Sequence, residues 1–199
     1  MTNGTRGPYK SGIESRRRLV ETAIHVFGER GYRGGSLRMI AEAVDAPASQ
    51  IINLFGSKDG LLVAVLDRWD ALQVENTELS GLPYVDALRA RIRYSHENPA
   101  WVEFLITLSA EATAPGHPAH DYFVDRYRRI TDRLQEEIVR AADIGEILPM
   151  AGTEARTEAH RLSAMMDGLQ LQWLLDREFD IVAAFDGYLD ELIARWRGE

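Results

Sequence analysis

Apolar side chains recur at intervals of three and four residues along nearly the whole chain. The first clear stretch contains Leu19, Val20, Ala23, Ile24 and Phe27. This spacing places apolar side chains on one face of an α-helix, whereas a half-buried strand would alternate at every second residue. No useful alternating stretch occurs, and the prolines at positions 8, 47, 83, 99, 115, 118 and 149 fall between the periodic stretches. The pattern predicts an all-α fold.

Glycines, prolines and small polar residues set the expected helix bounds. Gly31 is expected to end the first helix, and Ser36 and Ser57 to cap the helices that follow them. Ala46 is expected to cap a short helix with Pro47 at its first position, since the residue before a proline avoids helical angles. Helices are expected at about 14–30, 36–43, 47–55, 57–76, 84–97, 99–113, 119–142, 153–177 and 180–196.

Composition narrows the chemistry and the compartment. The chain has 199 residues, of which 45% are hydrophobic, and no cysteine. That length suits one large domain or two small ones. The lack of cysteine excludes disulfides, cysteine-bound zinc and a cysteine nucleophile, and it fits a cytoplasmic location. No apolar run reaches the ~18 residues of a membrane span, and the polar N-terminal segment does not have the pattern of a secretory signal.

Charge is divided unevenly along the chain. Residues 1–60 contain nine Lys and Arg against six Asp and Glu, a net charge of +3, whereas the other 139 residues carry −11. A basic head on an acidic body indicates that the head meets a polyanion and the body does not.

The segment from Pro47 to Phe55 suits the second helix of a helix-turn-helix. Ile51 and Phe55, with either Leu54 or Ile52, can anchor it to the core. The opposite side then presents Ala48, Ser49, Gln50 and Asn53. Small side chains permit close approach to base edges in the major groove of DNA, and Gln and Asn can each pair with adenine. The alternative is an ordinary short amphipathic helix.

The stretch from residue 16 to residue 62 resembles the N-terminal DNA-binding domain of the tetracycline-repressor (TetR) family. The residues that carry the resemblance are Ala23, Phe27, Gly31, Tyr32, Ser36, Ile40, Ala41, Phe55, Ser57 and Lys58. The resemblance implies a three-helix helix-turn-helix domain with a basic N-terminal arm at 1–60. It also implies a helical ligand-binding and dimerisation domain at 61–199.

The chain departs from the family pattern within the helix expected to read DNA. Ile52 stands where the family commonly has Tyr, and Leu54 stands at or near a frequent His. Gly35 replaces a usual Thr, and the turn Asp45–Pro47 replaces Gly-Val-Ser. The family's Tyr and His typically touch phosphates or bases, so the operator sequence cannot be carried over by analogy.

Basic residues around the head complete the expected DNA contacts. Arg16 and Arg17 enter the first helix and can lie along phosphates, with a solvated helix start as the alternative. Lys58 begins the fourth helix beside free backbone N–H groups, where the resemblance implies a phosphate contact. The expected DNA-binding residues are Arg16, Arg17, Ser36, Ala48, Ser49, Gln50, Asn53 and Lys58.

The last two helices carry narrow apolar seams with alternating spacings of three and four, the pattern of packed helix pairs. Two such helices from each of two subunits would build a four-helix interface around a two-fold axis. The resemblance favours this homodimer, and internal packing within one subunit is the alternative. The expected interface residues are Leu162, Met166, Gly168, Leu169, Trp173, Phe185, Leu189 and Leu192.

The resemblance further implies a cavity for a small-molecule effector among the middle helices. The expected lining is Trp101, Phe104, Leu108, Tyr127, Met165 and Gln170, with plain core packing as the alternative for each. The fourth helix, through Trp69 and Leu72, is expected to link the reading head to this cavity. His117 and His120 form too weak a cluster to predict a metal, and no cofactor is expected.

These observations favour a DNA-binding transcriptional regulator. The resemblance implies a repressor that a small-molecule effector releases from a pseudo-palindromic operator in double-stranded DNA. An enzyme is the first alternative, although the chain has no Ser-His-Asp order, metal-ligand motif or phosphate-binding glycine loop. A helical interaction protein with degenerate DNA binding is the second. No membrane partner is expected.

Overall fold

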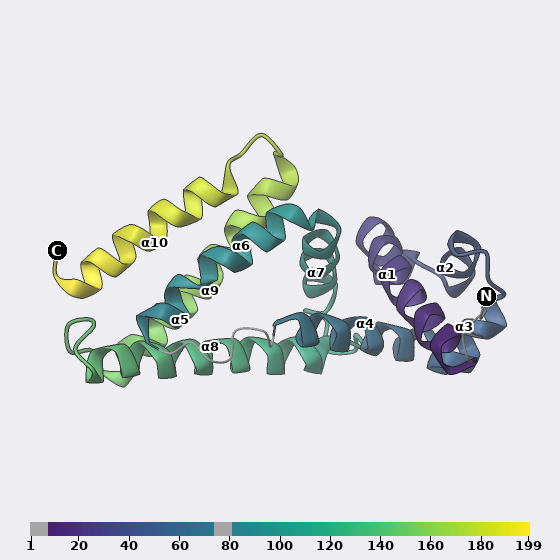
Figure 1. Cartoon of the computed structure of the whole chain (residues 1–199), viewed down its shortest axis with the longest axis horizontal. Coiled ribbons are helices and arrows are strands. Elements are labelled where there is room, and N and C mark those ends of the chain that lie inside the picture. The colour runs from purple at the N-terminus through teal and green to yellow at the C-terminus, as the bar shows by residue number, and fades with distance from the viewer. Residues whose placement is uncertain (1–7, 74–80) are drawn as a thin grey trace, which may run out of the picture.

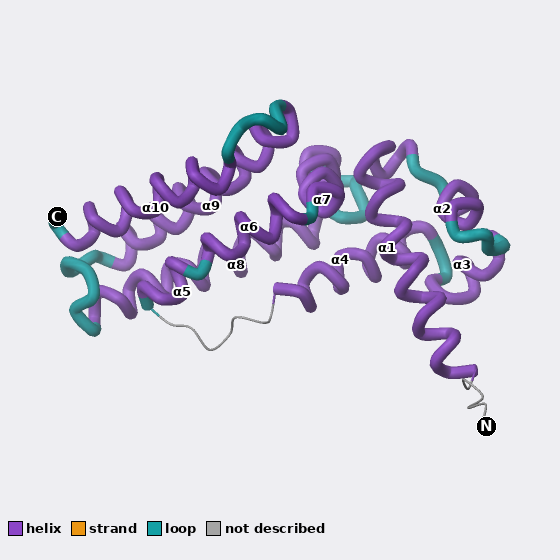
Figure 2. Tube along the Cα trace, turned by 45° about the horizontal axis from the view of Figure 1, so that its top comes forward, coloured by secondary structure: helices purple, strands orange, loops and turns teal. Residues whose placement is uncertain are grey.

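The computed structural model describes residues 8–73 and 81–199, and this part of the chain consists of helices joined by turns (Figures 1 and 2). The all-α prediction is therefore confirmed. The helices are α1 (Pro8–Gly34), α2 (Leu37–Ala43), α3 (Ala48–Phe55), α4 (Lys58–Gln73), α5 (Leu82–Asp86), α6 (Leu88–Glu97), α7 (Pro99–Glu111), α8 (His120–Asp143), α9 (Gly152–Leu175) and α10 (Ile181–Arg197). None of the described helices is both long and apolar enough to cross a membrane.

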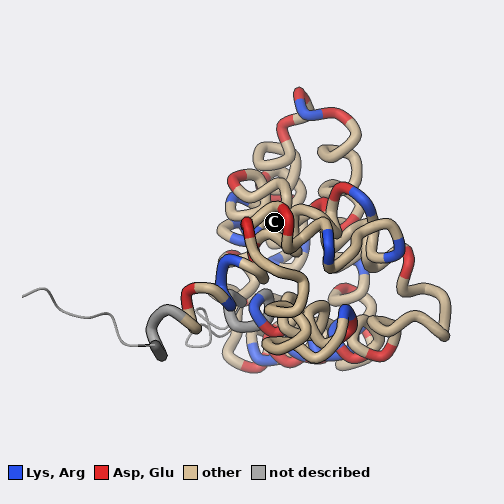
Figure 3. Tube along the Cα trace, turned by 90° about the vertical axis from the view of Figure 1, so that its right-hand side faces the viewer, with Lys and Arg blue, Asp and Glu red and all other residues tan. Residues whose placement is uncertain are grey.

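The molecule is elongated, with a head at one end. Helices α1, α2 and α3 form this head, and α10 ends at the opposite end (Figure 1). In the body, α8 packs along α9, and α10 packs against α6 and α9. A view along the long axis shows basic and acidic residues interspersed (Figure 3).

Buried apolar side chains form two clusters, and α7 contributes to both. The body cluster contains Val102 of α7 with residues of α5, α6, α8, α9 and α10. The head cluster is built from α1 to α4, but it also contains Phe104 and Leu108 of α7. The Phe104 ring stacks on Phe27 of α1, with ring centroids 6.4 Å apart. Phe123 of α8 belongs to this cluster as well, so the head completes its core with two helices of the body.

The crossing of α1 and α7 depends on Gly28. A Cβ at this position would lie 3.3 Å from the backbone nitrogen of Phe104 and 3.5 Å from the carbonyl oxygen of Ala100. The two backbones therefore approach each other with no side chain between them, which is a use that glycine permits.

Most of the expected caps are confirmed, but two helix bounds differ. The Ser36 hydroxyl accepts a hydrogen bond from the backbone N–H of Met39 (3.2 Å), and the Ser57 hydroxyl accepts one from Gly60 (3.0 Å). Pro47, not Ala46, is the N-cap of α3, because its ψ of 140° is extended and the helix begins only at the next residue. The helix expected at 84–97 is divided into α5 and α6 at Ala87.

Helix α1 extends beyond its expected start, and only part of the expected fourth helix is described. The first helix begins at Pro8, and Gly31 interrupts it at a φ of 68°, as expected for a helix-ending glycine. The structure describes α4 to Gln73. The expected end near Asn76, and the side chains of Trp69 and Leu72, lie outside the described residues.

We expect Gly31→Ala to destabilise the protein. The positive φ at Gly31 strains any other residue, and an added Cβ would lie 2.4 Å from Glu111 Oε1. The free energy of unfolding in urea should fall by about 1–3 kcal/mol. Gly12→Ala is the control, since Gly12 lies in α1 with no atom within 4 Å of its Cβ position, and it should be neutral or stabilising. A Gly31→Ala variant as stable as the wild type would contradict the prediction.

Candidate nucleic-acid interface and ligand pocket

Helices α2 and α3 form a helix-turn-helix. Ile40 and Ala41 of α2 are buried in the head core. Asp45 adopts a φ of 53°, which turns the chain sharply between the helices. The backbone N–H of Ala46 then donates to the carbonyl of Ala41 (2.9 Å) and closes the turn.

The faces of α3 are clearly divided. Ile51 is fully buried, and Leu54 and Phe55 pack against the head core while half-buried. Leu54 rather than Ile52 is therefore the additional anchor, which resolves the two possibilities left by the sequence. The exposed residues of the helix are Ala48, Ser49, Ile52 and Asn53.

Gln50 is placed differently from the other expected readers. Its amide nitrogen donates to the Ser15 hydroxyl of α1 (2.6 Å), and the side chain is half-buried. Ser36 caps α2 through its hydroxyl. In this structure, Gln50 and Ser36 therefore hold the head together, and the outward polar groups of α3 are those of Ser49 and Asn53.

The two arginines of α1 that are expected to contact DNA have different surroundings. The Arg16 guanidinium lies over the Phe55 ring, 4.9 Å from its centroid, and this places a fixed charge beside the end of α3. Arg17 forms exposed ion pairs with Glu14 (2.8 Å) and Glu21 (3.2 Å). Exposed pairs of this kind contribute little to stability, so Arg17 is readily available to another anion.

Lys58 begins α4 but points toward the head core. Its ammonium nitrogen lies 4.3 Å from the centroid of the Tyr32 ring. Burial lowers the pKa of Lys58, because desolvation disfavours the charged form, while the nearby carboxylates of Asp59 and Glu111 oppose that shift. To contact a phosphate, the ammonium would have to move off this ring.

Polar groups connect the end of α7 to the head. The Tyr32 backbone N–H donates to Glu111 Oε2 (2.9 Å), and the Tyr32 hydroxyl donates to Asp59. The His117 ring packs edge-on against Tyr32, with centroids 5.1 Å apart, and its Nε2 lies 3.7 Å from Glu111 Oε2. Burial lowers the pKa of His117, which favours its neutral form. Glu111 and His117 thus both contact the end of α1 from the body.

His117, between α7 and α8, and His120, the first residue of α8, bind backbone groups. His117 Nδ1 accepts from the Ala119 N–H (3.2 Å), and His120 Nδ1 donates to the Ala112 carbonyl (2.8 Å). No group of metal-binding side chains occurs among the described residues.

A small enclosed cavity of about 40 Å³ lies between α7, α8 and α9. Its polar groups are those of Ser109, Arg126, Tyr127, Asp167 and Gln170, and its apolar lining is Val102, Leu105, Ile106 and Phe123. The Tyr127 hydroxyl donates to Asp167 Oδ2 (2.8 Å). Burial raises the pKa of Asp167, and burial together with the Asp167 charge raises that of Tyr127 to about 12. The cavity therefore contains a half-buried carboxylate that is hydrogen-bonded to the hydroxyl of an aromatic side chain.

The expected lining residues fall into two groups. Tyr127 and Gln170 line the cavity, and Gln170 also donates to Ser95 (2.9 Å). Phe104 and Leu108 belong to the head core, and Trp101 packs edge-on against Phe104. Met165 packs against the body core. For these four residues, the structure shows the plain core packing that was the alternative.

The polar lining residues Arg126 and Asp167 were missed from the sequence. Asp167 is the single charged residue between Leu162 and Leu175. A lone carboxylate within an apolar seam is a signal that could have been used, because a buried charge requires a partner.

The structure places most of the expected dimer-interface side chains inside the protomer. The buried ones are Leu162, Leu169, Trp173, Phe185, Leu189 and Leu192, whereas Met166 and Gly168 are half-exposed. The exposed side of α9 instead presents Ala164, Leu171 and Leu175. The six buried side chains therefore pack α9 and α10 into their own subunit, while Met166 and Gly168 stay partly exposed.

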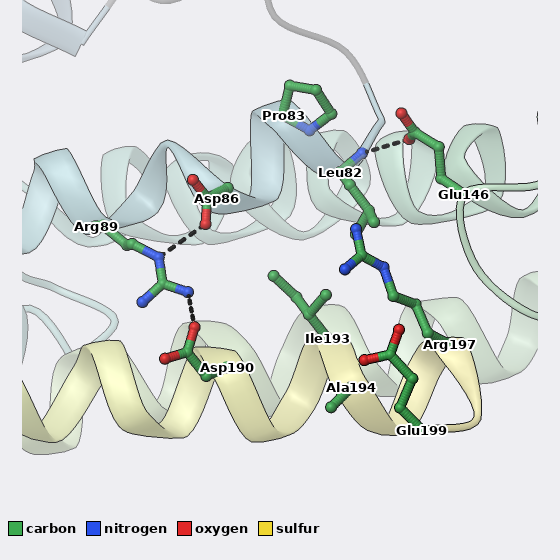
Figure 4. Close-up of a pocket in the computed structure, with 10 residues that line it drawn as sticks. All are labelled: Leu82, Pro83, Asp86, Arg89, Glu146, Asp190, Ile193, Ala194, Arg197 and Glu199. Atoms are coloured by element: carbon green, nitrogen blue, oxygen red, sulfur yellow. Dashed lines mark hydrogen bonds and ion pairs between the residues drawn. The ribbon is translucent and has the colours of Figure 1, made fainter.

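A larger open groove, of about 690 Å³, lies between the α5–α6 region and α10 (Figure 4). Arg89 of α6 crosses it, donating to Asp86 (2.7 Å) and to Asp190 of α10. Glu146 accepts a hydrogen bond from the Leu82 N–H at the start of α5 (2.8 Å). These contacts join α6 to α10, and they join the start of α5 to the turn that follows α8.

Comparison with known proteins places the two parts of the chain in one family. Residues 19–65 match the model of bacterial regulatory proteins of the tetR family. Residues 85–194 match the model of the BetI-type transcriptional repressor, C-terminal. Together these matches include the helix-turn-helix and all of the cavity lining.

Relatives and solved structures agree with these models. The chain is 27% identical to the HTH-type transcriptional regulator BetI of Paraburkholderia phytofirmans over 93% of this chain and 97% of the relative. It is similar in fold to a TetR-family regulator from Agrobacterium tumefaciens (TM-score 0.72, 19% identity, 94% of this chain and 99% of that one). It is also similar to a regulator from Saccharomonospora viridis in complex with choline (TM-score 0.70, 23% identity, 91% and 96%). The chain therefore belongs to the TetR family, and it is a DNA-binding transcriptional regulator.

Proposed function

We propose that the protein is a homodimeric repressor that binds a pseudo-palindromic operator through α3 and is released by a small molecule bound between α7, α8 and α9. The observation that carries this proposal is the position of α7. Val102, Leu105 and Ser109 of α7 line the cavity, whereas Phe104 and Leu108 complete the head core. One rigid helix therefore contacts both the ligand pocket and the DNA-binding head.

The small size of the cavity supports a coupled movement. About 40 Å³ accommodates ordered water but not an organic effector. Binding would therefore separate α7 from α8 and α9. Because α7 packs directly on α1 at Gly28 and contacts Tyr32 through Glu111, its displacement would tilt the head. The expected linking element was α4, but the side chains of Trp69 and Leu72 lie outside the described residues; the described contacts support α7 as a link.

We infer that the effector carries a positive charge. Asp167 is a half-buried carboxylate of the lining, burial raises its pKa, and it accepts a hydrogen bond from the hydroxyl of Tyr127. A carboxylate next to an aromatic ring suits an organic cation. Arg126 now lies over that ring, 5.6 Å from its centroid, and a cationic effector would replace it. The related structure in complex with choline makes choline the first probe.

The exposed face of α9 suits a second copy of the chain. Leu175 is 82% exposed and Leu171 is 46% exposed. A partner that covered these two side chains would gain the free energy of burying their apolar surface. Ala164 and Gly168 lie on the same side of α9, at helical spacings of four, three and four through Leu171 and Leu175. Small residues there let a partner helix approach closely. A dimer would place two α3 helices about one DNA turn apart, near 34–36 Å.

The alternatives receive less support. The relatives are named as regulators, which does not favour an enzyme. The outward face of α3 remains free of charged side chains and open to DNA, which does not favour a degenerate head. A repressor acts on chromosomal DNA, so we place it in the cytoplasm.

Fluorescence anisotropy with duplex DNA tests the function directly. The duplex from upstream of the protein's own gene should bind at least about 10³-fold more tightly than a random duplex at physiological salt. Addition of choline should weaken the specific complex more than the random one. Equal affinity for both duplexes would reject operator binding, and specific binding that no organic cation weakens would reject the proposed release.

We expect Asn53→Ala to relax the preference at one base pair by roughly 1–3 kcal/mol, because its exposed amide can read a base edge. Gln50→Ala should instead lower stability and leave base preference nearly unchanged, since its amide is held by Ser15. Ser15→Ala is the matched control and should reproduce Gln50→Ala in a panel of single-base operator variants. If Gln50→Ala relaxes the preference at one base pair and Ser15→Ala does not, the Gln50 amide must release Ser15 and contact that base.

We expect Leu175→Arg to yield a folded monomer, because the charge would be buried without a partner in the dimer but solvated in the free subunit. Sedimentation equilibrium gives the mass, and circular dichroism shows the fold. Leu169→Arg is the contrasting variant: Leu169 is buried in the protomer, so this change should prevent folding. A Leu175→Arg protein with the mass of a dimer would show that the interface lies on another face.

We expect Asp167→Asn to abolish choline binding in calorimetry and to stabilise the free protein by roughly 1 kcal/mol at pH 7. Burial raises the native pKa of Asp167, so its charged form is disfavoured in the folded state. The stability gain should therefore shrink as the pH falls from the raised pKa toward the ordinary carboxyl value. Asp125→Asn, at an exposed position of the same domain, should change neither property. Unchanged choline binding by Asp167→Asn would contradict the inference.

A further inference from the structure

The outward face of the reading helix α3 is uncharged. No residue from Ala48 to Phe55 carries a charge, in a chain of which 27% is charged. A face that only met solvent or phosphates would be expected to carry charged or strongly polar groups. An uncharged face instead fits the base edges, where close approach and matched donors or methyl groups decide affinity.

Ile52 lies at the centre of this face. It is 46% exposed, whereas the neighbouring Ile51 is fully buried. The head core is anchored by Ile51, Leu54 and Phe55, so packing within the subunit does not require an isoleucine at position 52. The exposed neighbours of Ile52 are the small residues Ala48 and Ser49 and the amide of Asn53.

Because Gln50 is bound within the head, Ile52 contributes more of the outward surface of α3. The Gln50 amide is bound to Ser15 at 2.6 Å, which removes the longest polar side chain from the outward face. Ile52 is then the largest side chain that α3 presents. Its χ1 angle is restricted in a helix because Cβ is branched, so little conformational freedom is lost when it is fixed against a surface.

We propose that Ile52 is a specificity-determining residue that packs against the 5-methyl group of a thymine in the operator. In the major groove, thymine alone among the four bases presents a methyl group, and the other edges present hydrogen-bonding atoms. An isoleucine in van der Waals contact with that methyl gains apolar burial. Against a donor or acceptor it would displace water without replacing the hydrogen bond. The inference rests on the proposed operator binding through α3.

Replacement of thymine by uracil tests this contact, because uracil lacks only the methyl group. An operator is first selected from random duplexes with the full-length protein, and each thymine is then replaced in turn. At one position per half-site, the substitution should weaken binding about fourfold, the factor expected for the loss of one buried methyl group. Substitution in both half-sites should weaken it about 15-fold by the same reasoning.

Variants of Ile52 connect the effect to this side chain. For Ile52→Ala, the uracil substitution at the same position should change affinity less than twofold, while Ile52→Val should retain most of the effect. Asn53→Ala is the matched control: it is exposed on the same helix and should lose preference elsewhere but keep the uracil effect. Since Ile52 is not part of the core, each variant should have the urea midpoint of the wild type.

The outcomes distinguish a failure of the Ile52 contact from a failure of operator binding. Specific binding that is insensitive to uracil at every position would overturn the role of Ile52 and leave operator binding intact. A uracil effect of equal size in the wild type and in Ile52→Ala would also overturn it, since the methyl would then act through another residue or through DNA shape. Failure to enrich any sequence in the selection would overturn both the operator binding and the inference that rests on it.

Discussion

The direct packing of α1 on α7 is the interaction on which the arrangement of the molecule depends. Gly28 brings the two backbones together, and the Phe27 and Phe104 rings stack beside the crossing. Because interiors are close-packed, a helix held in this way moves as a rigid unit and carries its partner with it. The orientation of the reading helix is therefore set by a helix that belongs in sequence to the body.

Polar contacts at the end of α7 form a second connection between the body and the head. Glu111 accepts a hydrogen bond from the backbone of Tyr32, and the Tyr32 ring in turn lies beneath the ammonium of Lys58. A small displacement of Glu111 would alter the surroundings of the lysine at the start of α4. The same few residues would connect the proposed movement of the pocket to the position of a charge near the expected phosphate contacts.

The sequence was sufficient to predict the helices and the helix-turn-helix, because helical periodicity and capping residues act over a few positions. Ser36, Gly31 and Ser57 were all placed correctly as helix ends. Tertiary choices were harder. A seam such as Leu162–Trp173 has the same spacing whether it meets its own subunit or a partner, and only the structure shows that it is buried within the protomer. The sequence likewise does not show whether Phe104 lines a pocket, and the structure places its ring on Phe27 in the head core.

The dependence of the head on Phe104 and Leu108 bears on how this protein can evolve. A DNA-binding head that closed its core alone could be exchanged between proteins as a cassette, so that new operators and new effectors combined freely. Here the head cluster takes part of its interior from α7, and a transplanted head would meet a foreign helix in place of α7. New combinations of operator and effector should therefore arise mainly by substitution on the exposed faces of α3 and within the cavity, with the α1–α7 junction inherited as a unit.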